Sequence, residues 1–172
     1  MTDLEIRATR FLAPVAQTLV AAALADLSER YGGPGDGTRV EAMEFDPPVG
    51  GFFVAYRDEE PVGCAGWRSH VDAESGTADG VAELKRMFVV PEARGTGVAT
   101  ELLAAVEHAA AGRGRTRMIL ECGTLQPEAI ALYEKVGYAR IPDFGFYRGW
   151  EGVRSYGRDL APRTDPLMPS PT

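Results

Sequence analysis

The sequence predicts an α+β domain in which helices flank a mostly antiparallel, mixed β-sheet. Short apolar runs separated by turn-forming residues recur along the chain, as expected for strands. Two of these runs, 52–56 and 62–67, are joined by a polar hairpin turn at 58–60. Longer helical stretches follow the first, fourth and fifth expected strands, which places helices against a sheet in a layered domain.

The first half of the chain begins with an alternating strand at 4–8 and a helix at 11–30, whose apolar residues recur at helical spacing. Glycine and proline between 31 and 37 make a loop. Residues 40–45 form either a short helix or an irregular segment, and the sequence does not decide between them. The hairpin of the second and third strands follows.

A polar loop is expected at 70–80, before a strand at 81–90 that alternates first and is continuously apolar at its end. This pattern predicts a strand that is exposed early and buried late, and Pro91 closes it because proline cannot donate to a ladder. The following helix is expected to end near Gly112. The remaining expected elements are a strand at 115–122, a helix at 127–136 and strands at 138–141 and 154–160.

Residues 1–160 are therefore expected to form a single domain, and 172 residues are enough for a substantial core. The segment 161–172 is rich in proline, serine and threonine and has no core pattern, so disorder is expected there.

Charge and composition exclude several partners. The net charge of -7 argues against nucleic acid, whose partners concentrate positive charge, and is compatible with a cationic amine substrate. No apolar run is long enough to span a membrane, and residues 1–10 contain no signal-peptide core, so a cytoplasmic protein is expected. Two scattered cysteines, Cys64 and Cys122, and two histidines offer no credible metal site, and both thiols are expected to be buried.

The turn between the fourth strand and its helix carries Gly95 and Gly97. Without Cβ atoms, the backbone can bend tightly and a ligand can approach its N–H groups. Those groups begin a helix, so they lack intrahelical partners and favour an anion such as a diphosphate, beside the guanidinium of Arg94. The pattern is neither a P-loop nor GxGxxG, and a ligand-free connection is the alternative.

Two motifs resemble those of the GNAT superfamily of N-acetyltransferases. Arg94-x-x-Gly97-x-Ala99 is similar to its acetyl-CoA pyrophosphate loop, Gln/Arg-x-x-Gly-x-Gly/Ala. Residues 126–138 are similar to its second signature, Asn-x-x-Ala-x-x-Leu-Tyr-x-x-x-Gly-Phe/Tyr, but Gln126 stands in the Asn position. The resemblance extends over 4–160, is strongest to small bacterial members, and implies the GNAT fold with acetyl-CoA as cosubstrate.

The resemblance assigns cofactor contacts to a strand segment, the glycine turn and the Asn position. These residues are Met87, Phe88, Val89, Arg94, Gly95, Thr96, Gly97, Val98, Ala99, Thr100 and Gln126. It also implies that the fourth and fifth strands splay apart, which leaves backbone groups free to hold the pantetheine arm. Lys135, Arg113 and Arg115 are candidates for the 3′-phosphate, or else ordinary solvated cations.

Two residues are expected to carry the proton transfers that acetylation of an amine requires. Glu83 matches the position of the catalytic Glu in several superfamily members, and its apolar neighbours are expected to raise its pKa; alternatively it is an exposed acid paired with Lys85 or Arg86. Tyr133 matches the tyrosine that lies near the cofactor sulfur, and alternatively is a core aromatic residue whose hydroxyl is satisfied.

The predicted function is acetyl-CoA-dependent N-acetylation of a small amine by direct transfer, since no nucleophilic cysteine is evident. The alternatives are a non-catalytic acyl-CoA-binding regulatory module and a peptide or protein N-terminal acetyltransferase. A homodimer is compatible with the sequence. The residues nominated for the acceptor are Tyr31, Arg68, His70, Phe146 and Tyr147.

Overall fold

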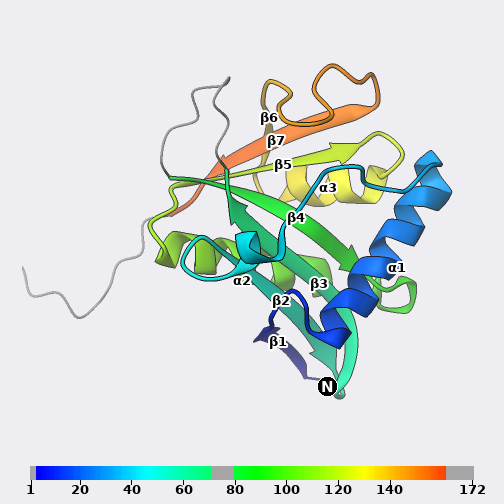
Figure 1. The fold of residues 1–172 in the computed structure, drawn as a ribbon, viewed down its shortest axis with the longest axis vertical. Helices are drawn as coiled ribbons and strands as arrows, with labels where there is room; N and C mark the ends of the chain where they lie inside the picture. The colour runs from blue at the N-terminus through cyan, green and yellow to red at the C-terminus, as the bar shows by residue number, and fades with distance from the viewer. Residues whose placement is uncertain (1–2, 71–79, 162–172) are drawn as a thin grey trace, which may run out of the picture.

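A seven-stranded sheet runs through the computed structural model, which describes residues 3–70 and 80–161 (Figure 1). Its strands follow the order β1-β2-β3-β4-β5-β7-β6 across the sheet. Every neighbouring pair is antiparallel except β4 and β5, which are parallel. The predicted mixed, mostly antiparallel sheet is confirmed. The strands are β1 (Leu4–Ala8), β2 (Gly50–Arg57), β3 (Glu60–Ser69), β4 (Val81–Val89), β5 (Arg117–Gly123), β6 (Ala139–Arg140) and β7 (Val153–Asp159).

Three α-helices and two short 3-10 helices complete the described part of the chain. The first α-helix begins later than predicted because Pro14 occupies its first helical position, where the missing N–H costs nothing. The segment 40–45, for which the sequence left open a short helix or an irregular segment, contains a 3-10 helix at Ala42–Phe45. The segments 71–79 and 162–172, which hold most of the expected 70–80 loop and the expected tail, lie outside the described residues. The helices are α1 (Pro14–Tyr31), η1 (Ala42–Phe45), η2 (Pro91–Ala93), α2 (Val98–Gly112) and α3 (Pro127–Lys135).

Two hydrophobic clusters cover the two faces of the sheet. Consecutive strand residues point to opposite faces, so Ala55 packs with α2 and α3 whereas Val54 packs with α1 and η1. The α1 cluster contains a stack of Phe11 on Phe45, with ring centroids 4.6 Å apart. Figure 1 shows α1 lying across β3 and β4 on one face, with α2 on the other side of the sheet.

The burial of β4 differs from the prediction. The strand is buried early, from Ala82 to Lys85, rather than late. Its pairing with β3 shifts register between Cys64 and Gly66, and Arg86 takes a left-handed φ of 57° at that point. This β-bulge re-aims the side chains that follow it, which the alternation of apolar residues could not reveal.

The parallel pair of β4 and β5 separates after three residues. The last paired positions are Glu83 and Ile119, although both strands continue. β5 instead pairs along its whole length with β7. The predicted splay is therefore present, and the end of β4 faces β5 across a gap in the ladder.

Candidate active site

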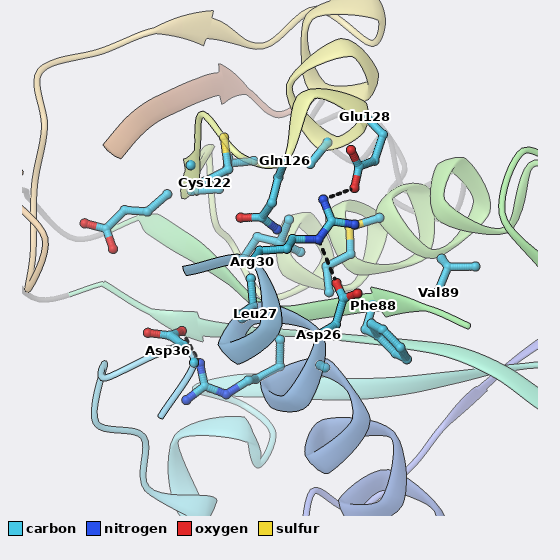
Figure 2. Close-up of a pocket in the computed structure, with 18 of the residues that line it drawn as sticks. Asp26, Leu27, Arg30, Asp36, Phe88, Val89, Cys122, Gln126 and Glu128 are labelled. Atoms are coloured by element: carbon cyan, nitrogen blue, oxygen red, sulfur yellow. Dashed lines mark hydrogen bonds and ion pairs between the residues drawn. The ribbon is translucent and has the colours of Figure 1, made fainter. Parts of the chain in front are cut away.

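A cavity of about 1030 Å³ opens where β4 and β5 separate. Its walls come from the end of α1 and the following loop, the second half of β4, the glycine turn, β5, α3 and the segment before β7. Figure 2 shows side chains from these elements converging, with Phe88 and Val89 on one side and Cys122 and Gln126 on another. The volume is at the upper end of the range for ligand pockets, roughly 300–1,000 Å³.

The glycine turn lines this cavity as predicted. Gly95 and Gly97 have φ of 74° and 89°, and a Cβ on either would meet no atom within 4 Å. The glycines are thus needed for their left-handed backbone rather than for packing space. The first helical bond of α2 runs from Glu101 N to Gly97 O at 3.1 Å, so the amides of the preceding turn begin the helix without intrahelical partners.

Two side chains of the turn hold it in place. The hydroxyl of Thr96 donates to Ala93 O at 2.5 Å and accepts from Arg57 at 2.9 Å, so Thr96 is absent from the cavity lining. Arg94 lines the cavity, and its Nε donates to Val89 O at 3.0 Å. One terminal nitrogen of Arg94 lies 3.6 Å from Asp26. Thr96 therefore anchors the turn, whereas Arg94 places a cation at its rim.

The remaining predicted cofactor residues also line the cavity. They are Met87, Phe88, Val89, Val98, Ala99, Thr100 and Gln126. Gln126 accepts a hydrogen bond at 3.4 Å from the hydroxyl of Tyr31 on α1, and this hydroxyl also accepts from the Leu125 amide. Of the three cations suggested for the 3′-phosphate, Lys135 lines the cavity and Arg115 instead donates to Ser69.

A salt-bridge network crosses the cavity between α1 and α3. Arg30 contacts Asp26 at 3.2 Å and Glu128 at 2.5 Å, as Figure 2 shows. The same guanidinium donates to Leu125 O at 3.0 Å. These contacts fix the start of α3, and with it Tyr133.

Tyr133 reaches the end of β4 from α3. Its side chain is buried and its hydroxyl lies 3.7 Å from the sulfur of Met87. Burial raises its pKa above the ordinary value for tyrosine, so the phenol keeps its proton at neutral pH. No stronger acceptor among the described residues takes that proton, which leaves the hydroxyl available as a donor in the cavity.

The surroundings of Glu83 differ from those predicted from the sequence. Its side chain is only 4% exposed, and it is absent from the cavity lining. Arg68 Nε and His70 Nδ1 lie 3.1 and 3.2 Å from its Oε2. Burial opposes its ionisation, but the His70 hydrogen bond and the charges of Lys85 and Arg68 outweigh burial and lower its pKa. The predicted raised pKa is therefore wrong. The alternative is wrong about exposure but right about a pairing with Lys85, whose Nζ lies 3.9 Å from Glu83 Oε1.

Two of the residues nominated for the acceptor contact Glu83 and do not line the cavity. Arg68 and His70 face Glu83, and Arg68 in addition contacts Glu44 at 3.1 Å. Tyr31, Phe146 and Tyr147, the other three nominated residues, line the cavity.

Glu121 on β5 was not singled out by the sequence. Its side chain lines the cavity, and its buried Oε1 has no hydrogen-bond partner among the described residues. Burial raises its pKa to about 7, the charge of Lys85 opposes this, and three nearby carboxylates reinforce it. Those carboxylates belong to Glu83, Asp36 and Asp143. A lone carboxylate between Leu120 and Cys122 in an apolar strand was the available signal, the same one that drew attention to Glu83.

Asp36 neutralises the basic residues of β4. It forms an ion pair with Arg86 and lies 3.4 Å from Lys85 Nζ. Burial opposes its ionisation, but the Lys85 and Arg86 charges and the Thr38 amide together lower its pKa to about 2. Asp36 is thus ionised throughout the neutral range, in contrast to Glu121.

The two thiols are poor nucleophiles. Burial raises the pKa of both Cys64 and Cys122 to about 12, so neither forms a thiolate at neutral pH. Within residues 3–70 and 80–161, no group of three or more His, Cys, Asp and Glu side chains is arranged to hold a metal. None of the helices described is both long enough and apolar enough to cross a bilayer.

Comparisons with known proteins agree with this fold. Residues 16–138 match the model of the acetyltransferase (GNAT) family. An IAA acetyltransferase from Azospirillum brasilense is 41% identical over 96 residues, which cover 56% of this chain and 59% of that protein. A mycothiol acetyltransferase from Thermobispora bispora is 38% identical over 98 residues, 56% of this chain and 32% of the relative. The chain thus spans little more than half the length of the first of these relatives, and less of the second.

Solved structures resemble the chain over nearly its whole length. A Klebsiella pneumoniae protein named as a candidate acyl-CoA N-acyltransferase superposes with a TM-score of 0.73 at 26% identity, covering 92% of this chain and 98% of that one. An aminoglycoside 6′-N-acetyltransferase crystallised with coenzyme A gives a TM-score of 0.66 at 20% identity over 94% of this chain and 99% of its own, a likeness of fold. The chain belongs to the acetyltransferase (GNAT) family.

Proposed function

We propose that this protein transfers an acetyl group from acetyl-CoA to the primary amine of a small molecule. The observation that carries the proposal is one cavity that contains the glycine-turn amides, the Tyr133 phenol and the Glu121 carboxylate. These are an anion site, a proton donor and a proton acceptor, the three parts that the reaction needs.

The residues that line the cavity fit acetyl-CoA. Amides at the start of α2 and Arg94 suit its diphosphate, and the open edge of β4 from Met87 to Val89 suits the amide groups of its pantetheine arm. Bound there, acetyl-CoA would supply an activated acetyl thioester. The cavity volume of about 1030 Å³ leaves room for an acceptor as well.

Glu121 is the base that the geometry favours over Glu83. A general base works best when its pKa is near the working pH and when it can reach the proton. Glu121 has a pKa of about 7 and lines the cavity, whereas Glu83 has a lowered pKa and is held by Arg68 and His70. Glu83 is then a positioning residue that holds Arg68 and His70 and lies 3.9 Å from Lys85 Nζ.

The step balances with two residues of the chain. The ammonium form first loses one proton to solvent, because it has no lone pair. The neutral amine nitrogen then forms the new C–N bond to the acetyl carbon and loses a second proton to the Glu121 carboxylate. The C–S bond breaks, and the Tyr133 hydroxyl gives a proton to the leaving sulfur. With both thiols protonated, direct transfer is favoured over a route through an acetylated cysteine.

The test is to follow thiol release from acetyl-CoA with a panel of primary amines, and to titrate the protein with coenzyme A by calorimetry. We expect saturable binding of coenzyme A and amine-dependent thiol release with an N-acetylated product. Binding without any acetylated product would instead favour the non-catalytic acyl-CoA-binding module. The cytoplasmic location and the homodimer stay predictions.

A further inference from the structure

Three aromatic side chains form a cluster at the rim of the cavity, between α3 and β7 in the chain. They are Phe146, Tyr147 and Trp150, and their rings contact one another, with centroids 4.9 Å apart for the first two and 5.2 Å for the last two. All three line the cavity. Phe146 and Trp150 are nonetheless 58% and 60% exposed, so a ligand could bury a large apolar area there.

Tyr147 fixes this aromatic cluster to the loop after α1. Its hydroxyl accepts from the Gly37 amide at 2.6 Å and donates to Asp36 Oδ1 at 3.1 Å. The exposed rings of Phe146 and Trp150 therefore pack beside a tyrosine that hydrogen bonds already hold in place. Such a preformed apolar surface costs little to order when it binds a ligand.

The charges in the same part of the cavity are unevenly matched. Lys85 and Arg86 are both paired with Asp36, which also accepts a hydrogen bond from the Tyr147 hydroxyl. Glu121 lacks a hydrogen-bonding partner among the described residues at its buried Oε1. A cationic group entering the cavity would find an unpaired carboxylate, whereas an anionic group would find the basic side chains already neutralised and would face Glu121.

The Gly145 backbone approaches that carboxylate closely. Gly145 has a φ of 70°, and a Cβ placed on it would lie 3.1 Å from Glu121 Oε1. The glycine is next in the chain to Phe146, so Glu121 and the aromatic cluster adjoin. An amine at Glu121 would thus carry its substituent toward the exposed rings.

We infer that the acceptor is a primary amine on an apolar, preferably aromatic, body that carries no carboxylate of its own. This rests on the proposed function and names its substrate class. The ammonium group pairs with Glu121, and the body packs against Phe146 and Trp150. A cation near aromatic faces adds to this attraction.

Three amines test the inference at saturating acetyl-CoA. 2-Phenylethylamine has the expected features, phenylalanine adds a carboxylate to the same skeleton, and ethanolamine replaces the ring with a hydroxyl. We expect kcat/KM for 2-phenylethylamine to exceed that of either comparison amine by about tenfold or more. Equal or higher kcat/KM for phenylalanine or ethanolamine would overturn the substrate class while leaving the acetyltransferase proposal standing.

Variants of the aromatic cluster make the test specific. Phe146→Ala and Trp150→Ala should each raise KM for 2-phenylethylamine by about three- to tenfold, and by more than they raise KM for ethanolamine. Met43→Ala is the matched control, because Met43 is 73% exposed and lies outside the cavity lining. An unchanged KM in both ring variants would count against the inference.

Binding can be read without turnover from tryptophan fluorescence. The chain has two tryptophans, and Trp67 is buried whereas Trp150 is exposed in the cluster. In the coenzyme A-saturated protein, 2-phenylethylamine should change the fluorescence, and Trp150→Phe should abolish the change. Binding without acetylation would support the substrate class and overturn the proposed function, and the absence of both binding and acetylation would overturn both. Acetylation of an N-terminal phenylalanyl peptide but not of 2-phenylethylamine would also overturn the class.

Discussion

The Nε atom of Arg68 lies 3.1 Å from Oε2 of Glu83, and both side chains are largely buried. This contact is one reason why Glu83 and Glu121, the two carboxylates next to the cavity, differ in their pairing. Glu83 is held ionised by Arg68, His70 and Lys85, whereas Glu121 is left without a partner at its buried oxygen among the described residues. Pairs of titratable groups whose surroundings push their pKa values apart divide roles in this way.

Glu121→Gln should lower kcat by about 100-fold, the lower end of the contribution of a general base, with KM for acetyl-CoA unchanged. Steady-state thiol release measures both constants. Glu101→Gln is the control, because Glu101 is exposed on α2 and outside the cavity lining. A Glu121→Gln enzyme with kcat near that of the parent would remove Glu121 from the mechanism.

Glu83→Gln should act mainly on stability. The substitution leaves the buried charge of Arg68 without one of its carboxylates, which costs about 3 kcal/mol or more in the free energy of unfolding. Urea denaturation measures this loss, and kcat per folded molecule should fall by less than about tenfold. A stable variant with kcat reduced as much as in Glu121→Gln would return the base to Glu83.

The activity should depend on pH through Glu121. Because the base must be ionised, kcat/KM should rise with pH and reach half its maximum at about 7, the pKa of Glu121 in the ligand-free protein. The Lys85, Glu83, Asp36 and Asp143 charges that set this pKa remain in Glu121→Gln, so that variant tests the assignment. If activity of Glu121→Gln rose with pH around the same midpoint as in the parent, the rise would belong to another group.

The same raised pKa predicts a pH-dependent effect on stability. Folded Glu121 binds its proton more tightly than the unfolded chain, so its favourable contribution is full at low pH and is lost as the pH rises to about 7. Glu121→Gln should therefore gain stability relative to the parent between pH 5 and pH 8, by on the order of 1–2 kcal/mol after allowance for its partial exposure. Thermal unfolding at the two pH values measures the difference, and a constant or falling difference would contradict the assigned pKa.

Tyr133→Phe should lower kcat by about 10- to 100-fold while the Kd for coenzyme A stays the same, since only the proton donor is removed. Tyr138→Phe is the matched control: its ring is 5.7 Å from that of Tyr133, but its hydroxyl donates to Glu107 away from the cavity lining. Equal kcat values for the two variants would mean that Tyr133 is a core aromatic residue only.

Gly95→Ala and Gly97→Ala should each weaken coenzyme A binding by about tenfold, measured by calorimetry, because alanine disfavours their left-handed backbone by about 1–2 kcal/mol. Gly114→Ala is the control. Gly114 has a φ of 81° and equally open surroundings, but lies outside the cavity lining. It should lose similar stability and keep its affinity, and a matching loss of affinity in Gly114→Ala would point to general destabilisation.

The elements that could be predicted are those with local causes. β1 agrees with the predicted strand at both ends, and α3 begins at the predicted Pro127. The glycine turn was identified because a left-handed backbone calls for glycine at those positions. The bulge in β4 was missed because Arg86, a non-glycine residue with positive φ, gives no such signal.

By itself, the sequence determined the fold class, the glycine turn and the tyrosine of α3, since backbone conformation and periodicity depend on residues near one another in the chain. Only the tertiary structure decided that Glu83 is ion-paired, whereas Glu121 lines the cavity with a raised pKa. Arg68 and His70 come to Glu83 from β3 and its end, and Asp36 comes to Lys85 from the loop after α1. A pKa depends on neighbours in space, and these neighbours lie 13 to 49 residues away along the chain.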